Sequence, residues 1–374
     1  MIVRRAVRRS VRLALAPARV RRLVESELAR RRGLDAARSP ARAAFAAAGP
    51  SGSLEPERTF TDRHGTAHRL DPALRDRLKP SWRVMCDPVA VAAPPSDDAL
   101  RGRAKKARSV VAEARKLVEA ASGRPLTGRI LEIGCYDGAS SFALATDPAT
   151  SVVGSDLARY YVVQRPGEPT EAEIDAQQVA LATLRERARA IAGIDPGRVA
   201  FVEDDITASS LEAGSFDAIV SFEVLEHLTR PTNGFAAMAR LLRPGGVVYH
   251  DYNRFFAVNG GHSLVTLDMP WGHARLDDAD VQRYLREVRP AEVDQALRFY
   301  RENLNRMTMA DLRAAVDAAG LELLALVPWS QRSLVADLAP AVLADVQRVY
   351  PGVSLEDLLA TFVAVIARRP VSGR

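Results

Sequence analysis

Residues 130–138 read ILEIGCYDG, and this stretch decides the fold. Its apolar, β-branched first half, residues 130–133, is typical of a short buried strand, and Gly134 and Gly138 bracket the turn that follows. Residues 140–145 then continue in a helical pattern. A strand, a tight glycine turn and a helix together place a ligand against the backbone N–H groups at a helix start. The stretch therefore predicts a nucleotide-type binding loop.

Four further strand-like segments follow the loop, and helical patterns separate them. The first, residues 151–156, ends in Asp156, 18 residues beyond Gly138, where a carboxylate can accept both ribose hydroxyls of a cofactor. The other three are residues 199–202, 215–221 and 245–250. Strands that alternate with helices predict a parallel sheet whose ligand lies across the carboxyl ends of the strands.

The pattern continues almost to the end of the chain. Residues 309–319 predict a helix ended by Gly320, and residues 321–327 predict a sixth strand. A further helical insertion near residues 333–349 precedes the apolar run 361–367, which predicts a last strand.

These motifs, in order, resemble those of the class I S-adenosylmethionine-dependent methyltransferases: LEIGCYDG, VVGSDL, FVEDDI, SFDAIVSFEVLEHL and LLRPGGVVYHDYN. A dehydrogenase would more often show a third loop glycine and would not be expected to carry FDAIVSFEVLEHL followed by RPGG. The resemblance covers residues 105–369. It implies an α/β, Rossmann-like, seven-stranded and mostly parallel sheet with an antiparallel last strand, and a transferase that uses S-adenosyl-L-methionine.

The resemblance assigns cofactor contacts to residues at the strand ends: Glu132, Gly134 and Gly138 around the methionyl part, Asp156 at the ribose, Asp205 and the Ile206 backbone at the adenine, and Glu223 on the methionine side. Glu226 and His227, in the same segment as Glu223, are expected to orient the following helix rather than to contact substrate.

Tyr136 departs from the pattern of the family, which usually has glycine at this position. A non-glycine residue with positive φ costs on the order of 1 kcal/mol or more. Some members that act on sugars carry a similar EIG-x-x-DG loop, so the departure is compatible with cofactor binding. We expect Tyr136 to flank the methionine moiety or the substrate pocket.

Three of the six histidines fall in residues 250–276, HDYNRFFAVNGGHSLVTLDMPWGHARL, where this fold leaves the methyl end of the cofactor. Imidazole is the natural proton acceptor near neutral pH, and an aliphatic hydroxyl acceptor benefits from a base. We expect His262 or His273 to be the general base, with His250 as a third candidate. Alternatively, these histidines hydrogen-bond the loop backbone and rigidify a lid.

A metal site built from Asp251, His262 and His273 is chemically possible, because histidine and carboxylate are good ligands. Their spacing matches no compact metal-binding pattern. The expectation is therefore that no metal is bound.

Charge and composition divide the chain into parts. Residues 1–45 hold thirteen arginines against three acids, so they contribute about +10 to a net charge of +6 and leave −4 for the remainder. We expect a basic amphipathic or disordered arm (1–45), a linker or cap region (46–104) and the methyltransferase domain (105–369). Within that domain, residues 252–308 and 328–358 are expected to be a substrate lid and a helical insertion.

The arm has two interpretations. Apolar residues share one helical face beside a row of arginines, which is typical of a helix on an anionic membrane or a partner, so peripheral membrane contact through residues 1–32 is one. The other is a solvated helix or tail of biased composition. The two cysteines, Cys86 and Cys135, and the lack of a long apolar run favour a cytoplasmic protein.

The sequence predicts in-line methyl transfer to a hydroxyl of a small molecule or of a sugar or glycan. One alternative is a lipid or quinone-like acceptor at a membrane surface, and another is a non-catalytic cofactor-binding or interaction protein. No specific nucleic-acid partner is expected, because the body lacks a basic, aromatic surface signature and an Asn-Pro-Pro-aromatic motif. The oligomeric state is left open.

Overall fold

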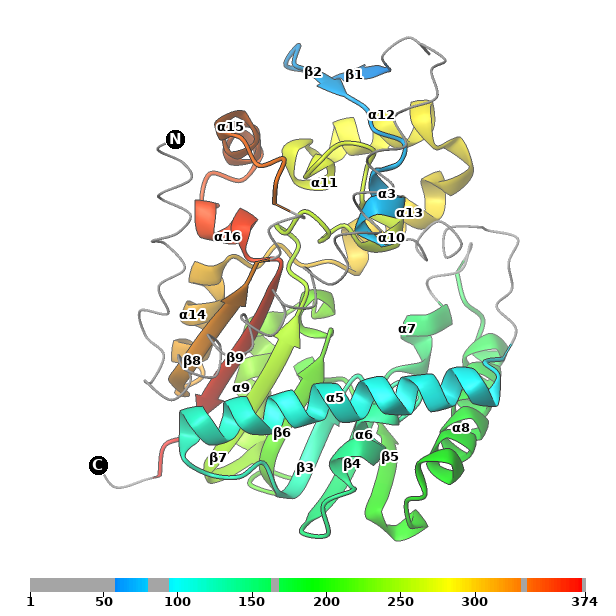
Figure 1. The fold of residues 1–374 in the computed structure, drawn as a ribbon, viewed down its shortest axis with the longest axis vertical. Helices are drawn as coiled ribbons and strands as arrows, with labels where there is room; N and C mark the ends of the chain where they lie inside the picture. The colour runs from blue at the N-terminus through cyan, green and yellow to red at the C-terminus, as the bar shows by residue number, and fades with distance from the viewer. Residues whose placement is uncertain (1–57, 80–93, 163–167, 331–334, 372–374) are drawn as a thin grey trace, which may run out of the picture.

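The computed structural model of the protein describes residues 58–79, 94–162, 168–330 and 335–371. It shows a sheet flanked by helices and a mainly helical cap over one end of that sheet (Figure 1). The basic arm and Cys86 lie outside the described residues, and with them the expectation of membrane contact. No helix in the described part of the chain is both long enough and apolar enough to cross a membrane.

Within the described residues, the main sheet has seven strands: β3 (Gly128–Ile133), β4 (Thr150–Asp156), β5 (Val199–Glu203), β6 (Phe216–Phe222), β7 (Leu242–Tyr252), β8 (Glu322–Trp329) and β9 (Phe362–Arg368). Their order is β5-β4-β3-β6-β7-β9-β8. All neighbours pair in parallel except β9, which runs antiparallel to both β7 and β8. The fold class expected from the sequence is confirmed.

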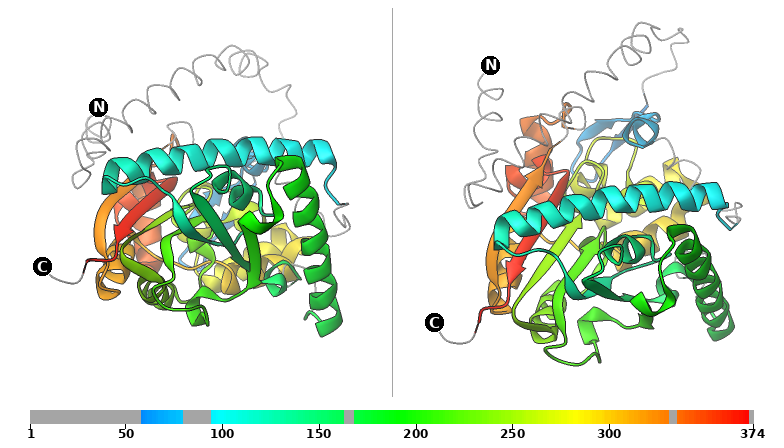
Figure 2. Two further views of the ribbon diagram at one scale, coloured as in Figure 1. Left: turned by 90° about the horizontal axis from the view of Figure 1, so that it is seen from below. Right: turned by 60° about the horizontal axis from the view of Figure 1, so that its bottom comes forward.

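Helices cover both faces of the sheet (Figure 2). Helices α5 (Asp97–Ser122), α6 (Ala139–Leu144) and α8 (Glu171–Ala192) lie on one side, and α9 (Pro231–Leu241) and α14 (Met309–Ala318) lie on the other. The strands alternate accordingly: Ile130 packs in the core under α5, while Leu131 packs in the core under α9 and α14. Short 3-10 turns complete this layer: η1 (Pro196–Arg198), η2 (Ile206–Ala208) and η3 (Leu225–His227).

Helix α5 begins within the range 46–104, which we expected to be a linker or cap region. The side chain of Ser96 accepts a hydrogen bond from the N–H of Ala99 and caps the helix, so the chain is helical from Asp97. Gly123 ends it with a φ of 72°. The first turns of the helix carry Arg103 and Lys106, which line a cavity described below.

The cap comes from three separate parts of the sequence. It consists of β1 (Thr59–Thr61), β2 (Ala67–Arg69), α3 (Leu74–Leu78), α10 (His262–Val265), α11 (Gly272–Arg275), α12 (Asp278–Val288), η4 (Pro290–Glu292), α13 (Val293–Glu302), α15 (Pro340–Val349) and α16 (Leu355–Leu359). These elements share one apolar core, in which Phe60 of β1 packs with Trp271 and Val346. Residues 58–79 therefore pack with the cap.

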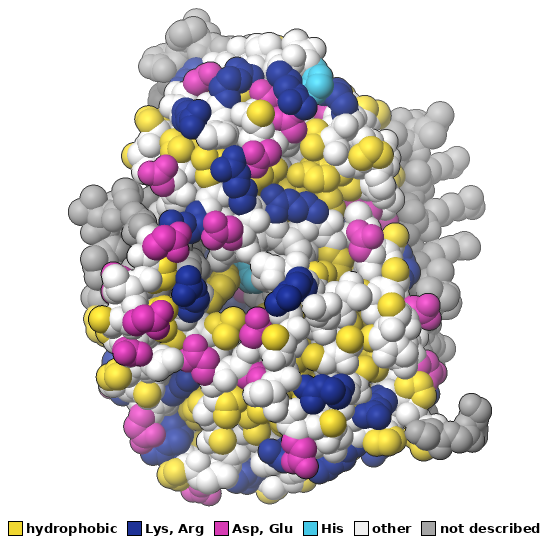
Figure 3. Space-filling view, turned by 180° about the vertical axis from the view of Figure 1, so that it is seen from behind, with side chains coloured by type: hydrophobic (Ala, Val, Ile, Leu, Met, Phe, Trp, Pro, Cys, Tyr) yellow, Lys and Arg dark blue, Asp and Glu magenta, His cyan; other side chains and the backbone are white. Residues whose placement is uncertain are grey.

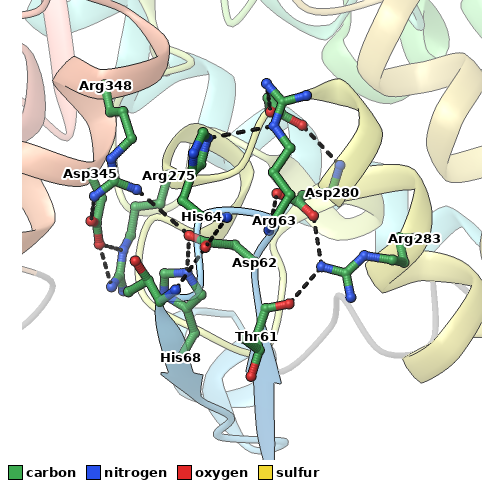
Figure 4. Close-up of polar contacts among 12 residues, drawn as sticks. Thr61, Asp62, Arg63, His64, His68, Arg275, Asp280, Arg283, Asp345 and Arg348 are labelled. Atoms are coloured by element: carbon green, nitrogen blue, oxygen red, sulfur yellow. Dashed lines mark hydrogen bonds and ion pairs between the residues drawn. The ribbon is translucent and has the colours of Figure 1, made fainter.

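Polar contacts fix the β1–β2 hairpin to the rest of the cap (Figure 4). The carboxylate of Asp62 lies 3.0 Å from Nε2 of His68 and 3.6 Å from Nη1 of Arg348. Arg348 and Arg275 both contact Asp345, at 2.6 Å and 2.8 Å. The hairpin, α11 and α15 are thereby joined, which makes the cap one packed unit above the sheet.

Candidate active site

A cavity of about 1040 Å³ lies between the carboxyl ends of β3, β4, β6 and β7 and the cap. Its walls include the loop after β3, the strand-end acids and residues of α5, and the cap contributes Leu78 and Asn259. The volume is sufficient for a nucleotide-sized ligand together with a small second molecule. From behind, Figure 3 shows a hollow with a histidine side chain visible in it, on a surface where charges of both signs are intermixed.

The structure brings seven of the eight proposed cofactor residues to this cavity: Glu132, Gly134, Tyr136, Asp156, Asp205, Ile206 and Glu223. Gly138 is absent from the lining as far as the structure is described. Its φ of 76° starts helix α6, and a Cβ there would lie 2.7 Å from the ring of Phe201. Gly138 therefore shapes the end of the loop rather than the wall of the cavity.

The loop after β3 turns sharply beside β4. The N–H groups of Gly134 and Cys135 both donate to the carbonyl of Ser155, at 2.8 Å and 3.1 Å. Gly134 has a φ of 71°, and a Cβ there would approach a methyl group of Val224 to 2.5 Å. Only glycine fits this position without displacing the neighbouring strand end.

Tyr136 adopts the left-handed conformation, with a φ of 43°. Its N–H donates to Oδ2 of Asp156 at 2.5 Å, and its carbonyl accepts from Nε of Arg185 at 2.8 Å. These contacts hold a conformation that costs about 1 kcal/mol or more for a residue with a Cβ. Tyr136, where the family usually has glycine, thus adopts the conformation that the turn requires and adds an aromatic side chain to the cavity wall.

Exchanging Tyr136 for glycine and for alanine should reveal this strain. Alanine is normally the more stabilising of the two, by about 0.5–1 kcal/mol, because glycine loses more entropy on folding. Here Tyr136→Ala should unfold at lower urea than Tyr136→Gly, since only alanine retains the cost of positive φ. A more stable alanine variant would show that the loop relaxes and that Tyr136 is not strained.

Carboxylates on the cavity wall, among them Glu132, Asp156, Glu223 and Asp251, make this end of the site acidic. Burial raises the pKa of Glu132 to about 8, and Ser141 donates a hydrogen bond to it. Burial and the charge of Glu223 raise the pKa of Asp251 to about 7. Burial also raises the pKa of Asp156. Because burial makes the charged form of these carboxylates unfavourable, the cavity wall favours a ligand that carries a positive charge.

Aromatic rings form a continuous row from the loop to the cap. Tyr136 and Tyr161 lie 4.9 Å apart, Tyr161 and Tyr160 5.3 Å, Tyr160 and His227 5.5 Å, and His227 and His262 5.0 Å, all between ring centroids. Tyr136, Tyr160, Tyr161 and His227 line the cavity. The row therefore connects the glycine loop to the histidine that opens helix α10.

His250 and His273 lie elsewhere, and neither is among the described residues of the cavity wall. His250 is buried, with Nδ1 2.7 Å from Oγ of Ser221, and burial lowers its pKa to about 3. His273 is buried as well, with Nε2 2.7 Å from the carbonyl of Phe255 and its pKa lowered to about 4 by burial. The contact of His273 with a loop carbonyl is of the kind described by the alternative in which histidines rigidify the lid, whereas His250 contacts a side chain of the neighbouring strand within the sheet. We propose neither as the base.

His262 instead lies beside Glu226 and His227, which we expected only to orient the helix that follows them. Its Nε2 lies 3.9 Å from Oε1 of Glu226, and its ring stacks near that of His227. Glu226 is fully buried, and His227 lines the cavity. Asp251, His262 and His273, the trio considered as metal ligands, form no such group among the described residues.

The profile of a methyltransferase domain family matches residues 103–326, which is more than half of the chain. The protein belongs to this methyltransferase family. The family is that of the class I enzymes, and its cofactor is S-adenosyl-L-methionine.

Curated relatives of this methyltransferase include ubiquinone biosynthesis O-methyltransferases. The protein of Nitrosococcus oceani is 31% identical over 174 residues, which is 44% of this chain and 59% of that protein. The protein of Alkalilimnicola ehrlichii is 29% identical over 175 residues, which is 45% of this chain and 57% of that protein. The matches thus span less than two thirds of these relatives.

Among solved structures, an S-adenosylmethionine-dependent methyltransferase from Mesorhizobium loti shares 18% identity with this methyltransferase. It gives a TM-score of 0.39 and covers 66% of this chain and 94% of that one.

The wall of the methyltransferase cavity fits a cationic cofactor, because carboxylates surround the loop where the methionyl part is proposed to lie. At Asp156, the hydrogen bonds that the carboxylate already accepts limit how the ribose of the cofactor can bind. A carboxylate offers about four acceptor positions, and Tyr136 N, Leu157 N and the Tyr161 hydroxyl already occupy three. One ribose hydroxyl can bind directly, and a second requires the Tyr161 hydroxyl to give up its place.

Proposed function

We propose that the protein transfers the methyl group of S-adenosylmethionine to a hydroxyl oxygen of a small molecule. The observation that carries this proposal is a single cavity whose wall includes the glycine loop, its acids and His227, the one member of the Glu226–His227–His262 cluster that lines it among the described residues. The eight cofactor residues inferred from the family keep that assignment as part of the proposal, with Gly138 acting through the loop.

Methyl transfer asks for positioning more than for covalent participation by the protein. The sulfonium of the cofactor supplies an activated methyl group. The chain must hold the acceptor in line with the S–CH₃ bond, exclude water and accept or disperse the proton of the hydroxyl. The cap provides the enclosure, the ring row provides an aromatic wall, and the cluster at the far end of that row is where we place the acceptor hydroxyl.

We further propose that the acceptor is a hydroxylated aromatic ring. Two observations support this choice: Tyr160 and His227 offer aromatic surfaces between the loop and the cap, and the curated relatives carry names that refer to ubiquinone biosynthesis. The sequence predicted a hydroxyl of a small molecule or of a sugar or glycan, and the name of neither relative given above refers to a sugar. Sugars therefore serve as the competing acceptor in the test.

Calorimetric titration and a transfer assay test the proposal together. The protein should bind S-adenosylmethionine with micromolar affinity and should not bind NADH. With radiolabelled cofactor, phenols with adjacent hydroxyls should be methylated at least about 10-fold faster than sugars, because only a flat ring uses the stacking wall. Cofactor binding with transfer only to sugars would reject the aromatic acceptor, and binding of NADH alone would reject the methyltransferase proposal.

A further inference from the structure

Glu226, His227 and His262 bring three metal-binding side chains together at the end of the ring row. Each offers one ligand atom, and these atoms lie within 4.8 Å of one another. Zinc bonds of 2.0–2.1 Å to nitrogen and oxygen place the ligand atoms of a tetrahedral site roughly 3.3 Å apart. Side-chain rotations that move each ligand atom by about 1 Å or less would bring the three atoms to the distances that an ion requires.

Two atoms of the cluster lack hydrogen-bond partners among the described residues. They are Oε2 of Glu226, whose residue is fully buried, and Nε2 of His262. The 3.9 Å between His262 Nε2 and Glu226 Oε1 is too long for a direct hydrogen bond. Leaving a buried polar atom without a partner costs about 1–3 kcal/mol. Both unpartnered atoms belong to the same cluster, so one ion could satisfy both.

The hydrogen bond of His227 prepares its ring as a ligand. Nδ1 lies 2.7 Å from the carbonyl oxygen of Asn303, which can only accept, so Nδ1 carries the hydrogen. In the neutral ring, the lone pair is then on Nε2. Metal-binding histidines almost always donate their other N–H to a carbonyl or carboxylate in this way.

The segment that carries the cluster is held from several sides. Asn305 donates from its side chain to the carbonyls of Leu225 and Leu228, at 2.6 Å and 3.0 Å, and from its backbone to that of Glu226, at 2.8 Å. The N–H of Asn253 donates to Oε1 of Glu226 at 3.1 Å. Three of these bonds hold the backbone of η3 and the residue that follows it. The fourth holds Oε1 of Glu226, the oxygen that lies 3.9 Å from Nε2 of His262, so the carboxylate is fixed beside that imidazole.

We propose that Glu226, His227 and His262 bind one divalent transition-metal ion, which holds the oxygen of the methyl acceptor. Two imidazoles and one carboxylate suit Zn²⁺, Fe²⁺ or Co²⁺ better than Mg²⁺ or Ca²⁺, which prefer oxygen ligands. Glu223 and Asp251 line the same cavity and add negative charge around the cation. The catalytic part of this inference rests on the proposed function, whereas ion binding does not.

Three protein ligands leave at least one coordination position open for the acceptor. An acceptor hydroxyl held there loses its proton more readily, and the proton leaves to water through the open cavity. The oxygen then forms a bond to the methyl carbon while the C–S bond breaks and its electron pair stays on sulfur. The products are a methyl ether and S-adenosylhomocysteine. This assignment replaces the general base, for which the sequence offered His262 or His273 with His250 as a third candidate.

Metal content tests the site without acceptor or cofactor. Tag-free protein, stripped with EDTA and dialysed, is titrated with Zn²⁺ and, separately, with Co²⁺, whose visible absorption reports its ligands. The wild type should bind about one ion per chain. Glu226→Gln and His262→Asn should each weaken binding by roughly 10–100-fold, the latter because asparagine tolerates the φ of 52° but lacks the imidazole. His64→Ala, which removes an exposed histidine, is the matched control.

The same proteins separate this inference from the proposed function. Titration with S-adenosylmethionine checks that each variant is folded and retains the cofactor site. Equal ion binding by the wild type and both cluster variants, or stabilisation by millimolar Mg²⁺ alone, would overturn the site. Transfer that continues at the wild-type rate after EDTA treatment would overturn its catalytic role and leave the methyltransferase proposal standing. Ion binding at the cluster without transfer to any acceptor would uphold the site and reject the proposed function.

Discussion

Replacing Asp156 with alanine should weaken the binding of S-adenosylmethionine by roughly 100-fold or more. The carboxylate ends β4 and lines the cavity where the ribose is proposed to bind. Hydrogen bonds to a charged group contribute about 1.5–3 kcal/mol each. If the Tyr161 hydroxyl gives up its place and both ribose hydroxyls bind, the loss of two bonds costs at least about 3 kcal/mol, equivalent to a factor above 100. Calorimetric titration of the purified variant gives the affinity directly.

Asp156 also accepts the N–H of Tyr136 and the hydroxyl of Tyr161, so the ribose contact must be separated from an effect on the loop. Tyr161→Phe removes the competing hydroxyl and should leave cofactor affinity unchanged or slightly higher. Asp98→Ala removes an exposed carboxylate that pairs with Arg101, and should have no effect on affinity. Wild-type affinity in a folded Asp156→Ala variant would show that the ribose does not bind there.

The sheet and the acids at its strand ends could be predicted because their signals are local. Short apolar runs define the strands: Glu132 and Asp156 lie within such strands, and Asp205 lies two residues beyond the end of one. In a parallel sheet, the carboxyl ends of neighbouring strands meet at one edge. Positions read from separate motifs therefore converge on one cavity without any knowledge of long-range packing.

The positions of the histidines could not be predicted from the local sequence alone. His250 and Asp251 are neighbours on β7, and their side chains point to opposite faces of the sheet, so Asp251 lines the cavity while His250 packs near Phe235 of α9. Residue type and approximate position could not distinguish them, because a shift of one residue exchanges the faces. The strand register supplies the missing information.

The cluster at η3 depends on contacts between distant segments. His227 is fixed by the carbonyl of Asn303, 76 residues later, and Glu226 by the N–H of Asn253. The sequence did contain one usable signal: the motif EVLEH follows β6 and the motif GGH follows β7, and these two strands are neighbours. The cap that brings His262 down to Glu226 has no comparable local signal, because its core is assembled from three separate parts of the chain.

Replacing Asp357 with alanine should lower the free energy of unfolding by about 3–5 kcal/mol. Arg254 is fully buried just beyond β7, and Asp357 of α16 is the partner of its guanidinium. Nε and Nη1 of Arg254 have no other partner among the described residues, so the substitution leaves a buried, uncompensated charge. Asp357 also accepts the N–H of Met309 at 2.8 Å and the hydroxyl of Ser354 at 2.7 Å. Urea titration followed by circular dichroism measures the loss.

An exposed ion pair provides the matched control, because its charges stay hydrated when one is removed. Asp278→Ala breaks two hydrogen bonds to Arg301 on the cap surface and should cost about 1 kcal/mol or less. Adding Arg254→Met to Asp357→Ala should restore part of the stability, since the double variant removes the unpaired charge that the single one creates. A loss below 1 kcal/mol in Asp357→Ala, or no recovery in the double variant, would mean that Arg254 is stabilised by the loop around it rather than by this carboxylate.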